Sequence, residues 1–142
     1  MAIIQTQCTI FKLNLLKGLE NFTSTSPYVY KIALYNGNAS LDNTTLAYTT
    51  VNEVTGSGYT AGGATLTPIA PNSDNSSNTA YLSFNNVTWS PADFTTSGAL
   101  IYNSTTNAAV FVLNFGNAKT AANSFTITFP VDGASTAVIR IS

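Results

Sequence analysis

The sequence predicts an all-β fold, either an antiparallel β-sandwich or a jelly roll, with one short helix near the N-terminus. Three observations lead to this prediction. Short segments in which apolar and polar residues alternate follow one another at even spacing, with turn residues between them. Apolar residues recur at helical spacing only once, near the start of the chain. No strand–helix–strand repetition is present, which argues against a parallel sheet.

The chain of 142 residues suits one domain with one core. We therefore expect residues 1–142 to form a single β-sandwich domain, with residues 1–26 as an N-terminal arm and short helix. The helix is predicted over 9–20, where Phe11, Leu15 and Leu19 lie at helical spacing. It is expected to cover the open end of the β core, with a docking arm as the alternative. Thr9 is expected to cap its start, and Gly18 lies near its end.

Strand patterns follow from residue 28 onwards. In the segment 79–90 the apolar positions change parity at Asn85 and Asn86, which predicts a bulge or bend there. The apolar runs 98–104 and 108–116 are typical of a hairpin in the most buried part of a sheet. The predicted strands are 28–35, 44–50, 64–69, 79–90, 98–104, 108–116, 124–130 and 137–142, with a polar loop at 71–78. The core is predicted around Phe111, Leu113, Phe115, Phe125, Ile127, Phe129, Ile139 and Ile141.

Charged residues make up only 8% of the chain, against a typical share of about 25%. Asn, Thr and Ser supply the polarity instead, which suits a surface that packs against copies or neighbours. The five basic residues are scattered, so nucleic acid is not an expected partner. No apolar run approaches the roughly 20 residues of a membrane span, and no membrane partner is expected. Because Cys8 is the single cysteine, the chain cannot form a disulfide within itself.

The residues that usually carry enzyme chemistry are scarce. The chain has no histidine, which excludes Ser-His-Asp, Cys-His and histidine–metal arrangements. Four of the six acids, Asp42, Asp74, Asp93 and Asp132, lie within two residues of Asn, Ser, Pro or Gly, as Asp in turns does. We therefore expect no catalytic residue, no cofactor and no metal site, and we expect that the protein is not an enzyme.

The glycine-rich segment "NEVTGSGYTAGGATL" (52–66) could be mistaken for a phosphate loop. It has no lysine, and the residues that follow it read as a strand, whereas a phosphate loop leads into a helix. The spacing also departs from G-x-G-x-x-G, because Ala61 stands at the third position. We interpret the segment as a connection between strands that Tyr59 anchors. Tyr59 is either a staple on the chain's own core or a contact with a neighbouring subunit.

Several blocks of the sequence resemble, in order, a group of small tailed-bacteriophage virion proteins. The blocks include "FKLNLLKGLENF", "NEVTGSGYTAGG", "GALIYN", "AVFVLNFG" and "AVIRIS", and together the similarity covers nearly the whole chain. Such proteins commonly carry a histidine near "GLENF", where this chain has Glu20 and Asn21. The resemblance implies a structural role in a phage particle and brings no catalytic motif with it.

The resemblance implies that the protein is located in the virion after synthesis in the host cytoplasm. Within the virion, a capsid cement or decoration protein that binds at capsomer seams is the first interpretation. The alternative is a tail, collar or head–tail connector component, and a host-glycan-binding module is a further one. The expected partners are the major capsid protein or other virion proteins, with assembly as a homo-oligomer. The predicted interface residues are Ile3, Ile4, Phe11 and Tyr59.

Overall fold

The computed structural model describes residues 2–142 and has an antiparallel β architecture with one short helix, as predicted. Among these residues, no helix is long and apolar enough to cross a membrane. The elements are β1 (Thr6–Gln7), α1 (Thr9–Leu16), β2 (Tyr30–Tyr35), β3 (Ala64–Thr65), β4 (Asn72–Asp74), β5 (Thr79–Leu82), β6 (Val87–Ala92), β7 (Thr95–Asn103), β8 (Ala108–Thr120), β9 (Asn123–Ile127) and β10 (Ile139–Ile141).

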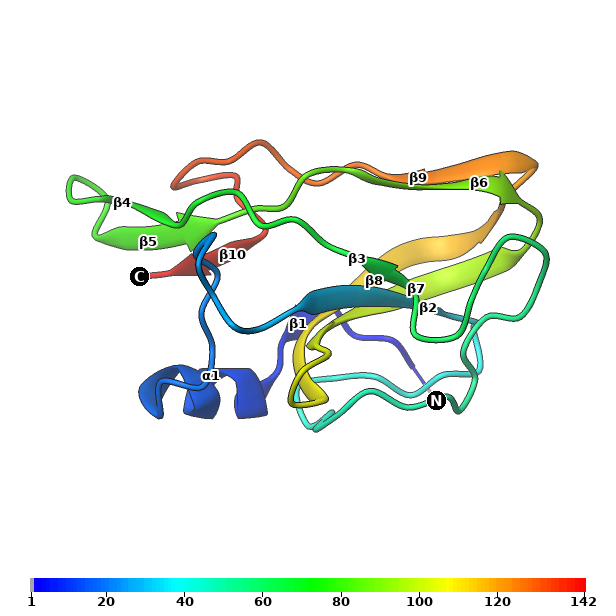
Figure 1. The fold of residues 1–142 in the computed structure, drawn as a ribbon, viewed down its shortest axis with the longest axis horizontal. Helices are drawn as coiled ribbons and strands as arrows, with labels where there is room; N and C mark the ends of the chain where they lie inside the picture. The colour runs from blue at the N-terminus through cyan, green and yellow to red at the C-terminus, as the bar shows by residue number, and fades with distance from the viewer. Residues whose placement is uncertain (1) are drawn as a thin grey trace.

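Two β layers form the body of the molecule (Figure 1). One layer is a five-stranded sheet in the order β1-β8-β7-β2-β3. The other layer consists of two small sheets placed end to end, β10-β5-β4 and β6-β9. The sequence predicted one strand over 79–90 with a bulge or bend at Asn85 and Asn86. The structure instead has two strands, β5 and β6, which residues 83–86 connect and which lie in different sheets. Every pairing between the named strands is antiparallel.

The predicted central hairpin is confirmed. β7 and β8 pair along their length, with Ile101 opposite Phe111, and β2 pairs with the other edge of β7. Ala99, Leu100 and Ile101 are all fully buried, although consecutive residues of a strand point to opposite faces. The five-stranded sheet therefore has to be covered on both of its faces.

The small sheets cover one face, and residues 36–51 cover the other (Figure 1). On the second face, the ring of Tyr48 stacks on Tyr102 with centroids 4.7 Å apart, and Tyr35 donates its hydroxyl to the carbonyl of Thr49. A strand was predicted at 44–50, but this segment makes only an isolated bridge from Ala47 to β8. Tyr48 of this segment packs on the sheet, whereas Leu46 is 66% exposed. The segment is therefore a covering loop, and its aromatic and β-branched residues explain the false strand pattern.

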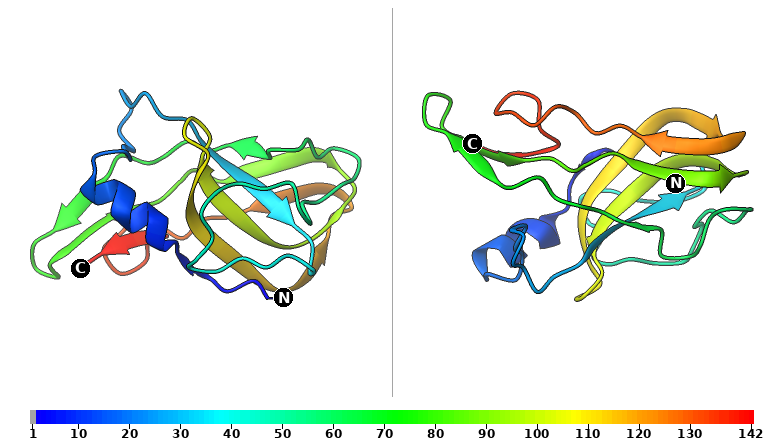
Figure 2. Two further views of the ribbon diagram at one scale, coloured as in Figure 1. Left: turned by 90° about the horizontal axis from the view of Figure 1, so that it is seen from below. Right: turned by 45° about the horizontal axis from the view of Figure 1, so that its top comes forward.

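α1 closes the end of the sandwich beside β10, and two views place it there (Figure 2). The helix ends at Leu16, four residues earlier than predicted. Its N-cap residue is Cys8 and not Thr9, and the Cys8 side chain makes no capping hydrogen bond. Gly18 has a φ of +72°, and the N–H groups of Gly18 and Leu19 donate to the carbonyls of Leu15 and Asn14. This is a Schellman ending, for which glycine is the favoured residue.

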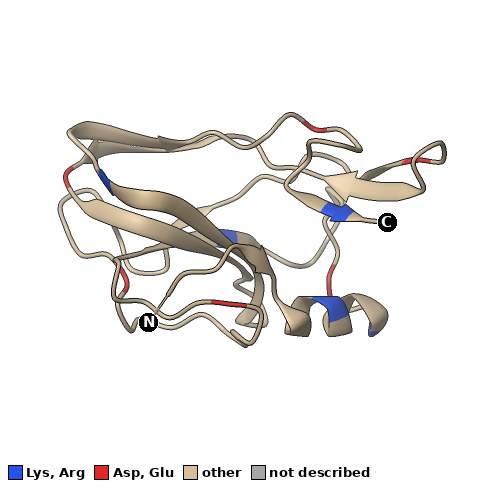
Figure 3. Cartoon of the chain, turned by 180° about the vertical axis from the view of Figure 1, so that it is seen from behind, with Lys and Arg blue, Asp and Glu red and all other residues tan. Residues whose placement is uncertain are grey.

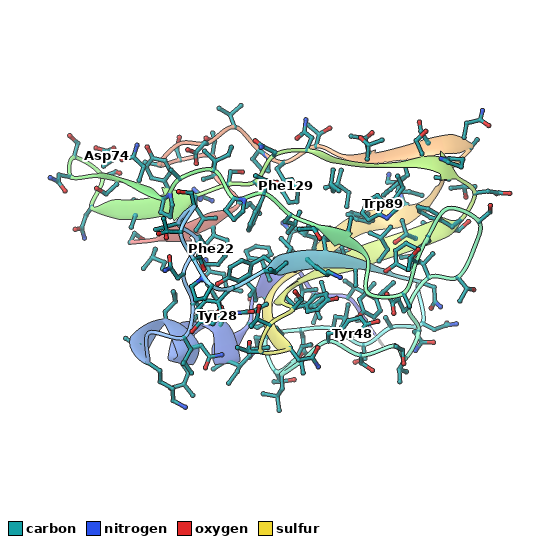
Figure 4. All side chains as sticks on the ribbon, viewed as in Figure 1. Phe22, Tyr28, Tyr48, Asp74, Trp89 and Phe129 are labelled. Carbon is teal, nitrogen blue, oxygen red and sulfur yellow. The ribbon has the colours of Figure 1, made fainter. Side chains whose placement is uncertain are left out.

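The predicted core is confirmed in part. Phe111, Ile127, Phe129 and Ile139 are buried, whereas Leu113, Phe115 and Phe125 are half-buried and Ile141 is 48% exposed. Trp89 and Phe129 both lie between the layers (Figure 4), where Phe129 packs against Phe84. The predicted loop at 71–78 also contains a short strand, because β4 turns back at residues 75–78 to pair with β5.

Replacement of Phe129 by alanine tests the placement of the core. The ring is 7% exposed and its centroid lies 5.5 Å from that of Phe84, so we expect Phe129→Ala to lower the free energy of unfolding by about 3–5 kcal/mol. Val131→Ala is the control, because Val131 is 77% exposed and should change stability by less than about 0.5 kcal/mol. Chemical denaturation measures both, and equal effects would contradict the placement.

Candidate functional site

Tyr59 acts as a staple on its own chain. Its hydroxyl donates to Oε2 of Glu53 (2.6 Å) and accepts the N–H of Leu34 (2.9 Å). Its ring packs near Trp89 and Phe94 in the core. Tyr59 therefore uses its polar and apolar parts inside the molecule, which agrees with the staple interpretation. The predicted contact between Tyr59 and a neighbouring subunit has no support in this geometry.

Glu53 is the centre of the network that holds the glycine-rich segment. Its carboxylate accepts hydrogen bonds from the hydroxyls of Tyr48 and Tyr59 (both 2.6 Å) and from the N–H of Gly62 (2.8 Å). Burial, together with the nearby Glu53 carboxylate, raises the pKa of the two tyrosines, so their hydroxyls remain donors. The network joins the core to the covering loop of residues 36–51. The glycine-rich segment therefore has a structural role in this protein.

Gly63 shows why the same segment needs glycine. Its φ is +80°, a conformation that side chains disfavour. A Cβ at this position would also overlap the carbonyl of Ile32 in β2. The backbone therefore crosses the sheet edge at close range, and no phosphate is needed to explain the glycine.

The other predicted interface residues divide into buried and exposed ones. Phe11 is fully buried and packs against Phe22, so the prediction that it contacts a partner is wrong. Ile3 is half-buried: its backbone bridges to Leu41, and its side chain lies against Gly98. Ile4 is 54% exposed and remains a predicted contact residue.

α1 has an unusual distribution of residues around its axis. Asn14 is buried, whereas Leu13 is 43% and Leu16 is 88% exposed. A helix on a protein surface normally turns its apolar residues inward and its polar residues outward. Helical periodicity identified Phe11 and Leu15 correctly, but it could not show that Leu13 and Leu16 face away from the core. This outer face is the candidate functional surface.

A groove separates α1 from β10 and the strands beside it. The larger part is a hollow of about 650 Å³ whose lining residues are Thr6, Gln7, Lys12, Leu15, Leu16, Arg140, Ile141 and Ser142. A second hollow of about 270 Å³ adjoins it and shares Leu15 and Ile141 with it. Lys12 of α1 and Arg140 of β10 both line the larger hollow, and basic positions are blue on the helix and on the strand next to the C-terminus in Figure 3. We call the two hollows together the α1–β10 groove.

Below α1, Glu20 is a buried carboxyl group whose hydrogen bonding is incomplete. Its Oε1 accepts from the hydroxyl of Tyr30 (2.9 Å) and from Nδ2 of Asn103 (3.0 Å). Its Oε2 is buried and has no hydrogen-bond partner among residues 2–142. Burial raises the pKa of Glu20, and the hydrogen bonds from Asn103 and Tyr30 offset this only in part.

The remaining reactive groups indicate no catalytic arrangement. Asp42 accepts from the N–H and hydroxyl of Thr44, and Asp74 accepts from the N–H of Ser76, as expected for turns. Burial, with a smaller contribution from Asp42, raises the pKa of the Cys8 thiol to about 12, so the sulfur is not a reactive thiolate. Residues 2–142 hold no group of acids and cysteine that could bind a metal ion.

Comparisons of the chain with protein-family models, curated proteins and solved structures find no match.

The two buried glutamates should respond in opposite directions to the same change. We expect Glu53→Gln to lower the free energy of unfolding by about 1–2 kcal/mol, because an amide cannot accept all three hydrogen bonds and loses their charge assistance. Thermal or chemical denaturation at neutral pH measures the change. An unchanged stability would show that the Glu53 network does not hold the loop.

Glu20→Gln should instead stabilise the fold at neutral pH. Because the folded-state pKa of Glu20 is raised, its contribution to stability is fully present below the ordinary pKa near 4.3 and is lost as pH rises. The variant removes this loss, so its melting temperature should exceed that of the wild type at neutral pH and approach it in acid. Hydrogen bonds from Thr44 lower the pKa of Asp42, so the contribution of Asp42 to stability is lost as pH falls. This contribution is the same in the wild type and in Glu20→Gln, and it cancels when their melting temperatures are compared at one pH. A variant less stable at neutral pH would contradict the assignment.

Proposed function

We propose that the chain is a structural component of a tailed-bacteriophage particle, and within it a capsid cement or decoration protein that binds at the seams between capsomers. The single observation that carries the proposal is the outer face of α1, which presents Leu13 and Leu16 to solvent and buries Asn14. The resemblance of the "GYTAGG" and "GALIYN" blocks to phage virion proteins supports it. The partners under this proposal are the major capsid protein or another virion protein, together with further copies of this chain.

The proposed mechanism is additive binding. Each copy contributes a modest apolar interface, and the symmetry of the shell repeats it, so that many weak contacts hold the set in place. Other apolar side chains are also exposed on the chain, among them Leu46, Val51 and Val131. With charged residues at 8% of the chain, apolar and hydrogen-bond contacts dominate. Attachment to the particle should therefore withstand high salt.

The alternative functions make different demands on the surface. A glycan-binding module needs an exposed aromatic platform, and Trp89 is only 7% exposed between the two layers. A tail, collar or head–tail connector component uses the same kind of surface as a cement protein. These two roles differ in copy number and in the step of infection that depends on the protein.

Particles that lack the protein provide the test. Under the cement proposal, deletion of its gene should leave particles that assemble but burst at a lower temperature or under milder osmotic shock. Addition of the purified protein should restore their resistance, since binding area is its only contribution. Particles that are equally robust but fail to adsorb or to eject DNA would favour the tail or connector role. An absence of the protein from purified particles would overturn the virion proposal itself.

A further inference from the structure

The α1–β10 groove combines an apolar floor with a basic rim. Leu15, Leu16 and Ile141 form apolar parts of the larger hollow, and Lys12 and Arg140 stand beside them. No Asp or Glu side chain among residues 2–142 lines this larger hollow, whereas the buried Glu20 lines the smaller one. Lys12 and Arg140 are two of the five basic residues of the chain, and both line the larger hollow. Arg140 also donates to the carbonyl of Ser135 (3.0 Å).

The exposure of these residues shows that the fold itself does not need them there. Leu16 is 88% and Ile141 is 48% exposed, and among residues 2–142 the Leu16 side chain is the most exposed of the large apolar ones. Leu16 is the last residue of α1, and Ile141, whose backbone pairs with Ala80 of β5, is the last residue of β10. The apolar area is therefore free to be buried by another molecule.

A second copy of the chain fits this surface poorly. In a two-fold symmetric pair, the same patch meets itself, so Lys12 and Arg140 would face their own equivalents across the contact. Like charges opposed at close range cost free energy when water is excluded. The hollow of about 650 Å³ is in the size range of sites that hold a small molecule. It is therefore large enough to hold a few side chains of a peptide segment.

We propose that the α1–β10 groove binds a short segment of a neighbouring protein in which apolar side chains are accompanied by Asp or Glu. The apolar side chains pack on Leu15, Leu16 and Ile141, and the carboxylates pair with Lys12 and Arg140 at the rim. The apolar contacts provide most of the affinity, because exposed ion pairs contribute about 0–1 kcal/mol each. The rim charges select the partner and its orientation. The inference rests on the proposed function, since it names the chemistry by which the chain attaches to its neighbour.

A random heptapeptide library on beads, presented to the purified full-length chain, tests the inference. Bound peptides should combine apolar residues with Asp or Glu and be depleted of Lys and Arg. The most enriched peptide is then titrated calorimetrically beside a version in which Asn and Gln replace its acids. We expect the neutral peptide to bind the wild type several-fold more weakly than the acidic peptide does. The two peptides should bind the double variant Lys12→Gln with Arg140→Gln equally well.

Leu16→Gln supplies the apolar arm of the test, and Leu46→Gln is its matched control, because Leu46 is 66% exposed on the covering loop. We expect Leu16→Gln to weaken peptide binding at least tenfold and Leu46→Gln to leave it unchanged. The inference is overturned if no peptide is enriched, if basic peptides are enriched, or if Leu16→Gln and Leu46→Gln weaken peptide binding equally. It is also overturned if sedimentation shows a dimer that Leu16→Gln dissociates, since a second copy then occupies the groove.

The peptide and particle experiments can fail independently. Peptide binding without any effect of the protein on particles would leave the groove chemistry intact and remove the virion role. A stabilised particle without peptide binding would retain the role and place the contact elsewhere on the surface.

Discussion

The need to cover both faces of the β7–β8 hairpin organises the whole molecule. Ala99, Leu100 and Ile101 are fully buried in succession, so each face of the sheet requires its own cover. The small sheets supply one cover, whereas an irregular loop supplies the other. Because a loop has no hydrogen-bonding ladder of its own, its polar groups need side-chain partners. Glu53 meets part of this need by gathering Tyr48, Tyr59 and Gly62 at the sheet edge.

The low charge of the chain makes such a centre unusually important. Few ionised groups are available, so the tyrosine hydroxyls and backbone groups carry the internal polar contacts. Glu53 and Glu20 show two outcomes of burying a carboxyl group. Glu53 accepts three donors, whereas one oxygen of Glu20 has no hydrogen-bond partner within residues 2–142. Burial raises the pKa of Glu20, and the hydrogen bonds that this carboxyl group accepts offset the effect only in part.

The sequence predicted those features that depend on local pattern. The β7–β8 hairpin followed from two apolar runs, and the irregularity near Asn85 and Asn86 followed from a change of parity. The structural role of the glycine-rich segment followed from its failed phosphate-loop spacing, whereas the sequence left open whether Tyr59 staples its own core or contacts a neighbouring subunit. The loop at 44–50 was misread as a strand, because covering a sheet demands the same aromatic and β-branched residues as belonging to one. The exposed position of Ile141 could not be predicted. Alternation shows which residues of a strand share a face, but it does not show whether another part of the chain covers that face.

The candidate site was the least predictable part, for a physical reason. Periodicity assumes that polar residues of a helix face water, yet Asn14 is buried in the region of Glu20, Tyr30 and Asn103. The polar atoms below the helix favour a polar side chain, Asn14, on its inner face. Leu16 therefore lies on the outer face. Only the three-dimensional contact between distant segments reveals this reversal. Of the four predicted interface residues, Ile4 alone is mainly exposed.

The larger hollow of the α1–β10 groove is lined by two segments that lie far apart in the chain, residues 6–16 and residues 140–142. Contacts between such distant segments must close long loops, and they form late in folding compared with a local hairpin. The hollow therefore comes into existence only when both segments have docked on the sheets. A chain still emerging from the ribosome, or one trapped half-folded, has no such hollow to offer. Recognition of the groove would thereby act as quality control, admitting only finished molecules into an assembly.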